Sequence, residues 1–193
     1  MPINILQAIN WVDVVVIILL FRVVYVSTKT DIYSELFKAL GTIVAIYISF
    51  HYYASLSVVL TSRLGLKAAE DSLNLACFII LVILGYWVLV VLRKFFLRFV
   101  KMEAIPELNK WGGLLLGAVR GLMLASILVF ILTLAPSGYL AKSVNSSFSG
   151  KKLFRIAPDI YSAVWNGFMS KFKPGETINK SALSTHKELE NKK

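Results

Sequence analysis

Four long apolar segments dominate the chain, and polar, charged stretches separate them. They cover about residues 5–26, 34–53, 73–92 and 111–134. A helix rises ~1.5 Å per residue, so about 20 apolar residues cross the ~30 Å hydrocarbon layer of a bilayer. The stretch 73–92 has no charged side chain, which is rare for a soluble helix of that length. The pattern predicts an all-α, polytopic membrane protein: residues 1–135 form a bundle of four transmembrane helices.

The first segment departs most from this pattern, because Asp13 lies inside it and Arg22 near its end. No basic stretch precedes it, and no clear small-residue cleavage site follows it. We therefore expect a retained first helix and not a cleaved signal peptide.

Beyond the fourth segment the pattern changes. Pro136 marks the end of that helix, and residues 136–155 are predicted as a polar loop. Residues 156–173 carry one apolar stripe at helical spacing, which predicts an amphipathic helix at the membrane interface or capping the bundle. The stripe consists of Ile160, Tyr161, Val164, Trp165, Phe168, Met169 and Phe172. Residues 174–193 are predicted as a disordered basic tail.

The composition supports a membrane location and narrows the partners. Only 17% of residues are charged and 57% are hydrophobic, against about a quarter charged in soluble domains. The net charge is +10, but no nucleic-acid-binding motif is present, so we expect no nucleic-acid partner. Lys94, Arg98 and Lys101 form one basic helical stripe, which is either a solvated face or a contact with anionic lipids.

The fourth segment carries a packing pattern and one charge. Gly113, Gly117, Gly121 and Ala125 recur at every fourth residue, a spacing that lets another helix approach closely. Arg120 lies about 20° from the direction of Gly113 around the helix. Since hydrocarbon solvates neither backbone nor charge, we expect Arg120 to point into the bundle.

Arg120 needs a partner, because a charge at a membrane helix centre costs about 2.5–3.5 kcal/mol even on insertion scales. The candidate partners are Asp13 and Glu35, so either an Asp13–Arg120 or a Glu35–Arg120 pair would satisfy it. The pair would be a static ion pair that fixes packing or part of a polar path for ions or solutes. A third alternative leaves Asp13 or Glu35 at the lipid headgroups.

The sequence contains no enzyme signature: GxSxG, HExxH and phosphate-binding loop patterns are absent. We therefore expect no catalytic site, no cofactor and no metal site. Cys77 is the only cysteine and is interpreted as a small apolar filler.

The basic residues in short connections predict the orientation. The connections after the first and third segments are richer in Lys and Arg than the connection after the second. Since cytoplasmic loops are usually the basic ones, we expect both termini outside the cytoplasm, although the basic tail opposes this.

Four stretches together resemble one known family: residues 10–13 (NWVD), Glu35-Leu36, residues 49–57 (SFHYYASLS) and residues 113–121 (GLLLGAVRG). Over about residues 8–135 the chain resembles the CvpA family, the colicin V production proteins of bacterial inner membranes. Two stretches depart from the family pattern. Residues 27–34 lack the usual Arg-Gly pair, and Asn109-Lys110 stands where the family often has Asp-Arg or Asp-Lys.

The resemblance implies a multi-pass inner-membrane protein associated with toxin (colicin V) production or export and with envelope homeostasis. The leading hypothesis is a non-enzymatic accessory or scaffold factor. The alternative is a small oligomeric transporter or channel that uses Asp13, Glu35 and Arg120 in a polar path. A homo-oligomer or other membrane proteins are the expected protein partners.

Overall fold

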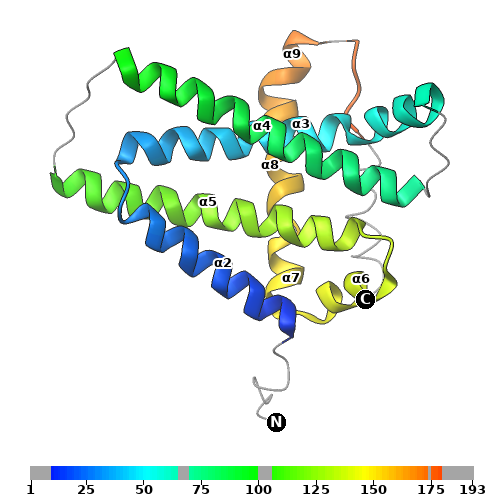
Figure 1. The fold of residues 1–193 in the computed structure, drawn as a ribbon, viewed down its shortest axis with the longest axis horizontal. Coiled ribbons are helices and arrows are strands. Elements are labelled where there is room, and N and C mark those ends of the chain that lie inside the picture. The colour runs from blue at the N-terminus through cyan, green and yellow to red at the C-terminus, as the bar shows by residue number, and fades with distance from the viewer. Residues whose placement is uncertain (1–9, 65–69, 100–105, 174, 180–193) are drawn as a thin grey trace.

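Four long helices build the protein. The computed structural model describes residues 10–64, 70–99, 106–173 and 175–179, and its regular structure is all helical. Helices α2 (Trp11–Ser27), α3 (Ile32–Leu64), α4 (Glu70–Phe99) and α5 (Pro106–Leu134) alternate in direction along the chain. They lie side by side in the order α4, α3, α5, α2 (Figure 1). The predicted all-α fold is therefore confirmed.

Three of these helices are long and apolar enough to cross a membrane: the stretches Ile32–Arg63, Glu70–Phe95 and Asn109–Leu134. Many of their large apolar side chains point outward, as on α4, where Trp87 is 61% exposed. Outward apolar faces of this kind are expected where lipid replaces water. Helix α2 has 17 residues, and the predicted first span begins at residue 5, within a stretch (1–9) outside the described residues.

Helix α3 is longer than predicted. The second apolar segment was expected to end at residue 53, but α3 continues to Leu64. Residues 54–64 contain no glycine or proline that would stop a helix. Phe50 and Tyr53, close to the predicted end, lie in the core. Phe50 packs against the rings of Phe78, Phe130 and Tyr161 at centroid distances of 5.2, 4.4 and 5.8 Å.

The predicted polar loop at 136–155 is wrong. Two short helices lie there, α6 (Gly138–Ser146) and α7 (Phe148–Leu153). The Ser147 side chain caps α7 by accepting a 2.9 Å hydrogen bond from the Gly150 N–H. Buried Val144 and Leu153 anchor the two helices to the bundle. Serine content favoured a loop, but here the serines cap helices and bind neighbouring segments.

A helical column then crosses the bundle, as Figure 1 shows. It contains α8 (Ile156–Val164), the π-helical turn η1 (Trp165–Met169) and α9 (Ser170–Phe172), in agreement with the predicted helix over 156–173. Tyr161 and Trp165 are buried, whereas Phe168 and Phe172 are exposed, so the stripe packs only at its first half.

Residues 175–179, part of the predicted disordered tail, return to pack on α3. The Asn179 amide donates a 2.8 Å hydrogen bond to the Phe50 carbonyl. Residues 180–193 of that predicted tail lie outside the described residues.

Candidate functional site: a buried ion pair where α2, α3 and α5 meet

Glu35 and Arg120 meet inside the bundle. Glu35 lies in the first turn of α3, and its side chain is completely buried. Arg120 lies in the middle of α5 and is 6% exposed. The Arg120 Nε and Glu35 Oε2 atoms are 3.1 Å apart. Of the two pairings left open by the sequence, the structure contains Glu35–Arg120.

The second carboxylate oxygen of Glu35 binds other groups. Lys38 Nζ donates to Oε1 at 2.6 Å and Thr30 Oγ1 donates to it at 2.7 Å. Arg120 Nη2 also donates a long, 3.5 Å hydrogen bond to Ser27 Oγ. We call Ser27, Thr30, Glu35, Lys38 and Arg120 the junction cluster. It holds two cations and one carboxylate, so Glu35 neutralises only one of the two positive charges.

The contact between Glu35 and Arg120 is mainly coulombic. Neither Oε2 nor Nε makes a well-aligned hydrogen bond, so the pair lacks the parallel fork of a bidentate Arg–carboxylate contact. A buried ion pair seldom adds net stability, but removing one partner leaves an uncompensated buried charge. The cluster therefore makes the helix junction depend on both charges being present.

The glycine face of α5 makes this approach possible. A side-chain carbon at Gly117 would overlap Ser27 of α2, and one at Gly113 would lie 3.2 Å from the Thr30 carbonyl oxygen. Gly121 faces Leu20 of α2 at 3.2 Å in the same way. Ala125, the fourth member of the predicted face, is fully buried.

Asn109 ties the start of α3 to α5. Its Oδ1 accepts a 2.6 Å hydrogen bond from the backbone N–H of Ile32. This first-turn donor has no partner within its own helix, so the contact satisfies it. The amide oxygen of Asn109 is thus the acceptor at the position where the family often has an aspartate.

Asp13 lies elsewhere and does not contact Arg120. It accepts hydrogen bonds from Ser147 Oγ at 2.7 Å, from Ser149 N at 2.8 Å and from Ser149 Oγ at 2.5 Å. It also accepts one from the Asn10 N–H at 2.9 Å. Asp13 therefore fastens the start of α7 to the start of α2. The expected polar set Asp13, Glu35 and Arg120 is divided between two places.

A third polar group involves His51, to which no role was assigned from the sequence. His51 Nδ1 lies 3.0 Å from the Tyr161 hydroxyl, and Nε2 lies 3.1 Å from Glu176 Oε2. The Asn179 N–H donates to the same hydroxyl at 2.9 Å. His51, Glu176 and Asn179 border an open cavity of about 540 Å³ beside α3. Sequence separations of 110 and 125 residues carry no local signal that could have revealed the group.

Charges at the surface side of this group reinforce one another. Lys173 Nζ donates to Glu176 Oε1 at 2.7 Å. This hydrogen bond raises the pKa of Lys173 and lowers the pKa of Glu176. Burial raises the pKa of Tyr161.

None of these groups forms a recognisable metal centre. Within residues 10–64, 70–99, 106–173 and 175–179, no three His, Cys, Asp or Glu side chains gather as metal ligands. The predicted lipid-binding stripe is only partly visible: Lys94 is exposed, the Arg98 side chain is outside the described set, and Lys101 lies outside the described residues.

Long helices with apolar outer faces around an internal ion pair define the chain as an all-helical membrane protein. A family model described as "Colicin V production protein" matches residues 12–157, a range that includes Asp13, Glu35 and Arg120. The chain therefore belongs to the colicin V production protein family, and the resemblance noted in the sequence is confirmed. A search of curated proteins and a search of solved structures each return no match.

Proposed function

We propose that this protein is a non-enzymatic, four-span accessory or scaffold factor of the bacterial inner membrane. It would serve toxin (colicin V) production or export and envelope homeostasis. Family membership supports the association with toxin production. The observation that carries the scaffold role is the Glu35–Arg120 pair, enclosed between closely packed helices.

Helix α2 supplies the fourth span in this proposal. Its 17 residues rise ~25 Å, at the short end of the range for a spanning helix. Its outward side chains are apolar, with Ile18 61% and Phe21 73% exposed. The lone outward cation, Arg22, can reach the headgroups through its long side chain.

The orientation is assigned from the basic residues at one end of the bundle. The end formed by the α2–α3 turn, the end of α4 and the start of α5 carries Lys29, Lys38, Arg93, Lys94 and Lys110. We assign this end to the cytoplasm, which places both termini outside it. Lys94, Arg98 and Lys101 would contact anionic headgroups there. A second copy or another membrane protein would pack on the outward apolar face of α4.

The division of the polar residues favours this role over a transporter or channel. A polar path needs ionisable groups in sequence along one route through the bundle. Here Asp13 binds serines at the start of α7, and Arg120 binds Glu35 near the opposite end of α2. Asp13 and Arg120 each have separate partners, as expected of residues that hold neighbouring segments together.

The test compares Arg120→Leu with Val119→Leu, whose side chain faces outward on the same helix. In cells that secrete a colicin V-type toxin, we expect Arg120→Leu to lower both membrane accumulation of the protein and secreted toxin. Val119→Leu should leave both unchanged. An Arg120→Leu protein that accumulates normally but loses ion or solute flux in proteoliposomes would refute the scaffold role and establish transport.

A further inference from the structure

The helical column crosses the long helices at one common level. Figure 1 shows α7 and the column running crosswise to α2, α5, α3 and α4. Asp13 of α2, Ser126 of α5 and Phe50 of α3 mark the crossing, because each contacts α7 or α8. The Ser126 hydroxyl, for example, accepts a 2.8 Å hydrogen bond from the Ala157 N–H. Specific contacts therefore fix the crossing level on three of the long helices.

The crossing lies about one hydrocarbon thickness from the opposite end of the bundle. At ~1.5 Å per residue, the long helices rise ~21–27 Å between the two levels, over residues 13–27, 32–50 and 110–126. The hydrocarbon layer of a bilayer is ~30 Å thick. The column therefore crosses the bundle close to the second surface of the membrane.

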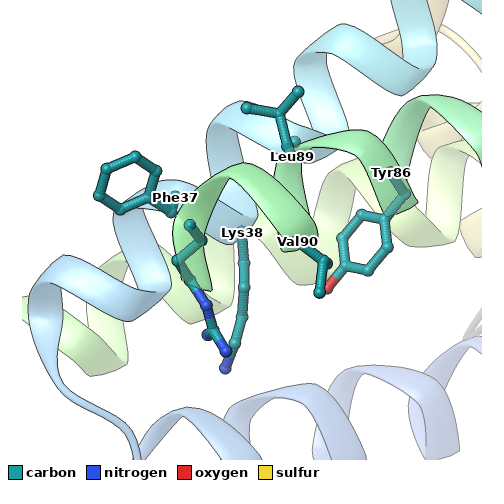
Figure 2. A pocket seen from close by; sticks show the side chains of 7 residues that line it. Phe37, Lys38, Tyr86, Leu89 and Val90 are labelled. Atoms are coloured by element: carbon teal, nitrogen blue, oxygen red, sulfur yellow. The ribbon is translucent and has the colours of Figure 1, made fainter. Parts of the chain in front are cut away.

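Cations mark the first surface on α3 and α4. Figure 2 shows Lys38 projecting from α3 close to Tyr86 and Val90 of α4, and Arg93 of α4 lines the same contact. Long basic side chains of this kind reach outward to the headgroups from the end of an apolar span. On α4 the stretch from these cations to the crossing, residues 78–92, contains no charged side chain.

The sequence becomes polar beyond the crossing. Residues 70–77 of α4 include Glu70, Asp71 and Asn74, in contrast to the uncharged stretch that follows. Residues 54–64 of α3 include Arg63 and four serine or threonine residues. Charged and amide side chains are costly inside hydrocarbon, so this change agrees with a membrane surface at the column.

The column buries its middle and exposes aromatic rings at its end. Tyr161 and Trp165 pack into the bundle, whereas Phe168 is 56% and Phe172 is 68% exposed. These two phenylalanine rings contact each other, with centroids 4.7 Å apart. Lys171, between them in the sequence, is exposed as well. Figure 1 shows α9, which carries Phe172, extending past α4.

An exposed ring and a lysine also lie on α7, at the other end of the crosswise row. Phe148 is 68% exposed, and Lys152 Nζ lies 4.3 Å from the centroid of its ring. Phenylalanine with lysine or arginine is typical of helices that lie in the membrane interface. A protein partner at one end would leave the other end exposed, whereas a lipid leaflet surrounds the bundle and meets both.

We propose that α7 and the column form a crossbar in the membrane plane, held by lipid at both ends. Phe148, Phe168 and Phe172 insert among the acyl chains of the leaflet farther from the α2–α3 turn. Lys152 and Lys171 contact the phosphates of the same leaflet. The middle of the column packs on the bundle, so the crossbar fixes the depth of the long helices. The inference rests on the membrane location of the chain and not on its orientation or its role in toxin production.

The test measures depth with nitroxide labels on the full-length protein in phosphatidylethanolamine–phosphatidylglycerol vesicles. Cys77 is the only cysteine, so Cys77→Ala provides a background in which Phe148→Cys, Phe168→Cys or Phe172→Cys is labelled singly. Electron paramagnetic resonance compares access of oxygen, which concentrates in hydrocarbon, with access of a water-soluble nickel complex. We expect all three labels ~5–10 Å below the headgroup boundary.

Two control positions bracket this depth. Asn166→Cys is matched to Phe168→Cys, because Asn166 is exposed on the same turn η1 but polar, and its label should be reached mainly by nickel. Ile83→Cys, on the outward face of α4, should lie deeper than the three aromatic positions. Equal nickel access at Phe168→Cys, Phe172→Cys and Asn166→Cys would place the rings in water and overturn the proposal. Exclusion of both reagents, with spectral broadening between copies, would show that a second copy covers the rings, and the lipid proposal would be wrong.

A measurement on unmodified wild type keeps the test independent of the substitutions. A lipid-soluble carbene reagent is activated in the same vesicles, and tryptic peptides are analysed by mass spectrometry. We expect insertion at Phe168 and Phe172 but not at Asn166. Absence of insertion at both phenylalanines, with normal insertion on α4, would contradict the crossbar.

Discussion

Two buried carboxylates fasten different parts of this protein. Glu35 holds α5 against the α2–α3 turn through Arg120, and Asp13 holds α7 against α2 through Ser147 and Ser149. Each carboxylate is surrounded by donors, as burial requires. Neither carboxylate is exposed to a polar path for ions or solutes through the bundle.

Replacement of Asp13 by alanine should release α7 without opening the long-helix bundle. The change removes the acceptor from several donors, and hydrogen bonds to a charged group are each worth about 1.5–3 kcal/mol. Lys151 and Lys152 are exposed just beyond the contact, so trypsin should cut there at least tenfold faster than in wild type.

Asp71→Ala is the matched control, because Asp71 is an exposed acid in the first turn of α4. Its tryptic pattern should equal that of wild type. If Asp13→Ala is cut no faster than this control, Asp13 does not hold α7.

Two close helix contacts organise the bundle at the scale of its elements. One joins α5 to α2 along Gly113, Gly117 and Gly121. The other joins α4 to α3 at Gly85, where a side-chain carbon would lie 2.8 Å from the Cα of Ala45. The repeated spacing of the first contact predicted it, whereas a single glycine within an apolar run gave no signal for the second.

Gly117→Ala should destabilise the bundle, because the new methyl group overlaps Ser27 and forces α2 and α5 apart. Overpacking of this kind typically costs about 1–3 kcal/mol. The comparison is Gly138→Ala, whose side chain would meet nothing within 4 Å. Unfolding by sodium dodecyl sulfate, followed by circular dichroism, measures both. Equal unfolding midpoints for the two variants would show that the α2–α5 contact accommodates the added methyl group.

For the molecule as a whole, hydropathy predicted the long helices and the family motifs predicted the family. Neither of them predicted how the C-terminal third packs against the bundle. The helices within residues 138–153 are too short and too polar for a helical pattern of apolar residues to be recognised in the sequence. These helices depend on the Ser147 cap and on Asp13. For the same reason the sequence could not decide which acid pairs with Arg120, since the partners of Asp13 lie in that segment.

The docking of residues 175–179 on α3 should weaken at acidic pH. The Lys173 hydrogen bond lowers the pKa of Glu176 below its ordinary value of 4.5. A depressed pKa stabilises the docked state above the unfolded value, and this stabilisation is lost as the pH falls through the folded value. We expect the fluorescence of Trp165, which stacks on His51, to change below about pH 4.5 in wild type.

Glu176→Gln serves as the control, because a glutamine side chain does not titrate in this pH range. It should show no such transition. A wild-type transition that persists unchanged in Glu176→Gln would assign the effect to another group.

Orientation is testable on the intact chain. A C-terminal alkaline phosphatase fusion should be active and a C-terminal green fluorescent protein fusion dark, because both termini are assigned outside the cytoplasm. Fusions truncated between α4 and α5 should give the opposite pair. A fluorescent C-terminal fusion would reverse the topology.

The most direct test of the central claim, that Glu35 and Arg120 stabilise the bundle as a pair, is a double-mutant cycle. Unfolding free energies are measured in mixed micelles for wild type, Glu35→Gln, Arg120→Leu and the double variant. We predict a coupling of about 1–3 kcal/mol. Glu35→Gln should be the more damaging single change, because it leaves two cations unneutralised, whereas Arg120→Leu leaves Glu35 bound to Lys38 and Thr30. Additive effects, with no coupling, would contradict the account.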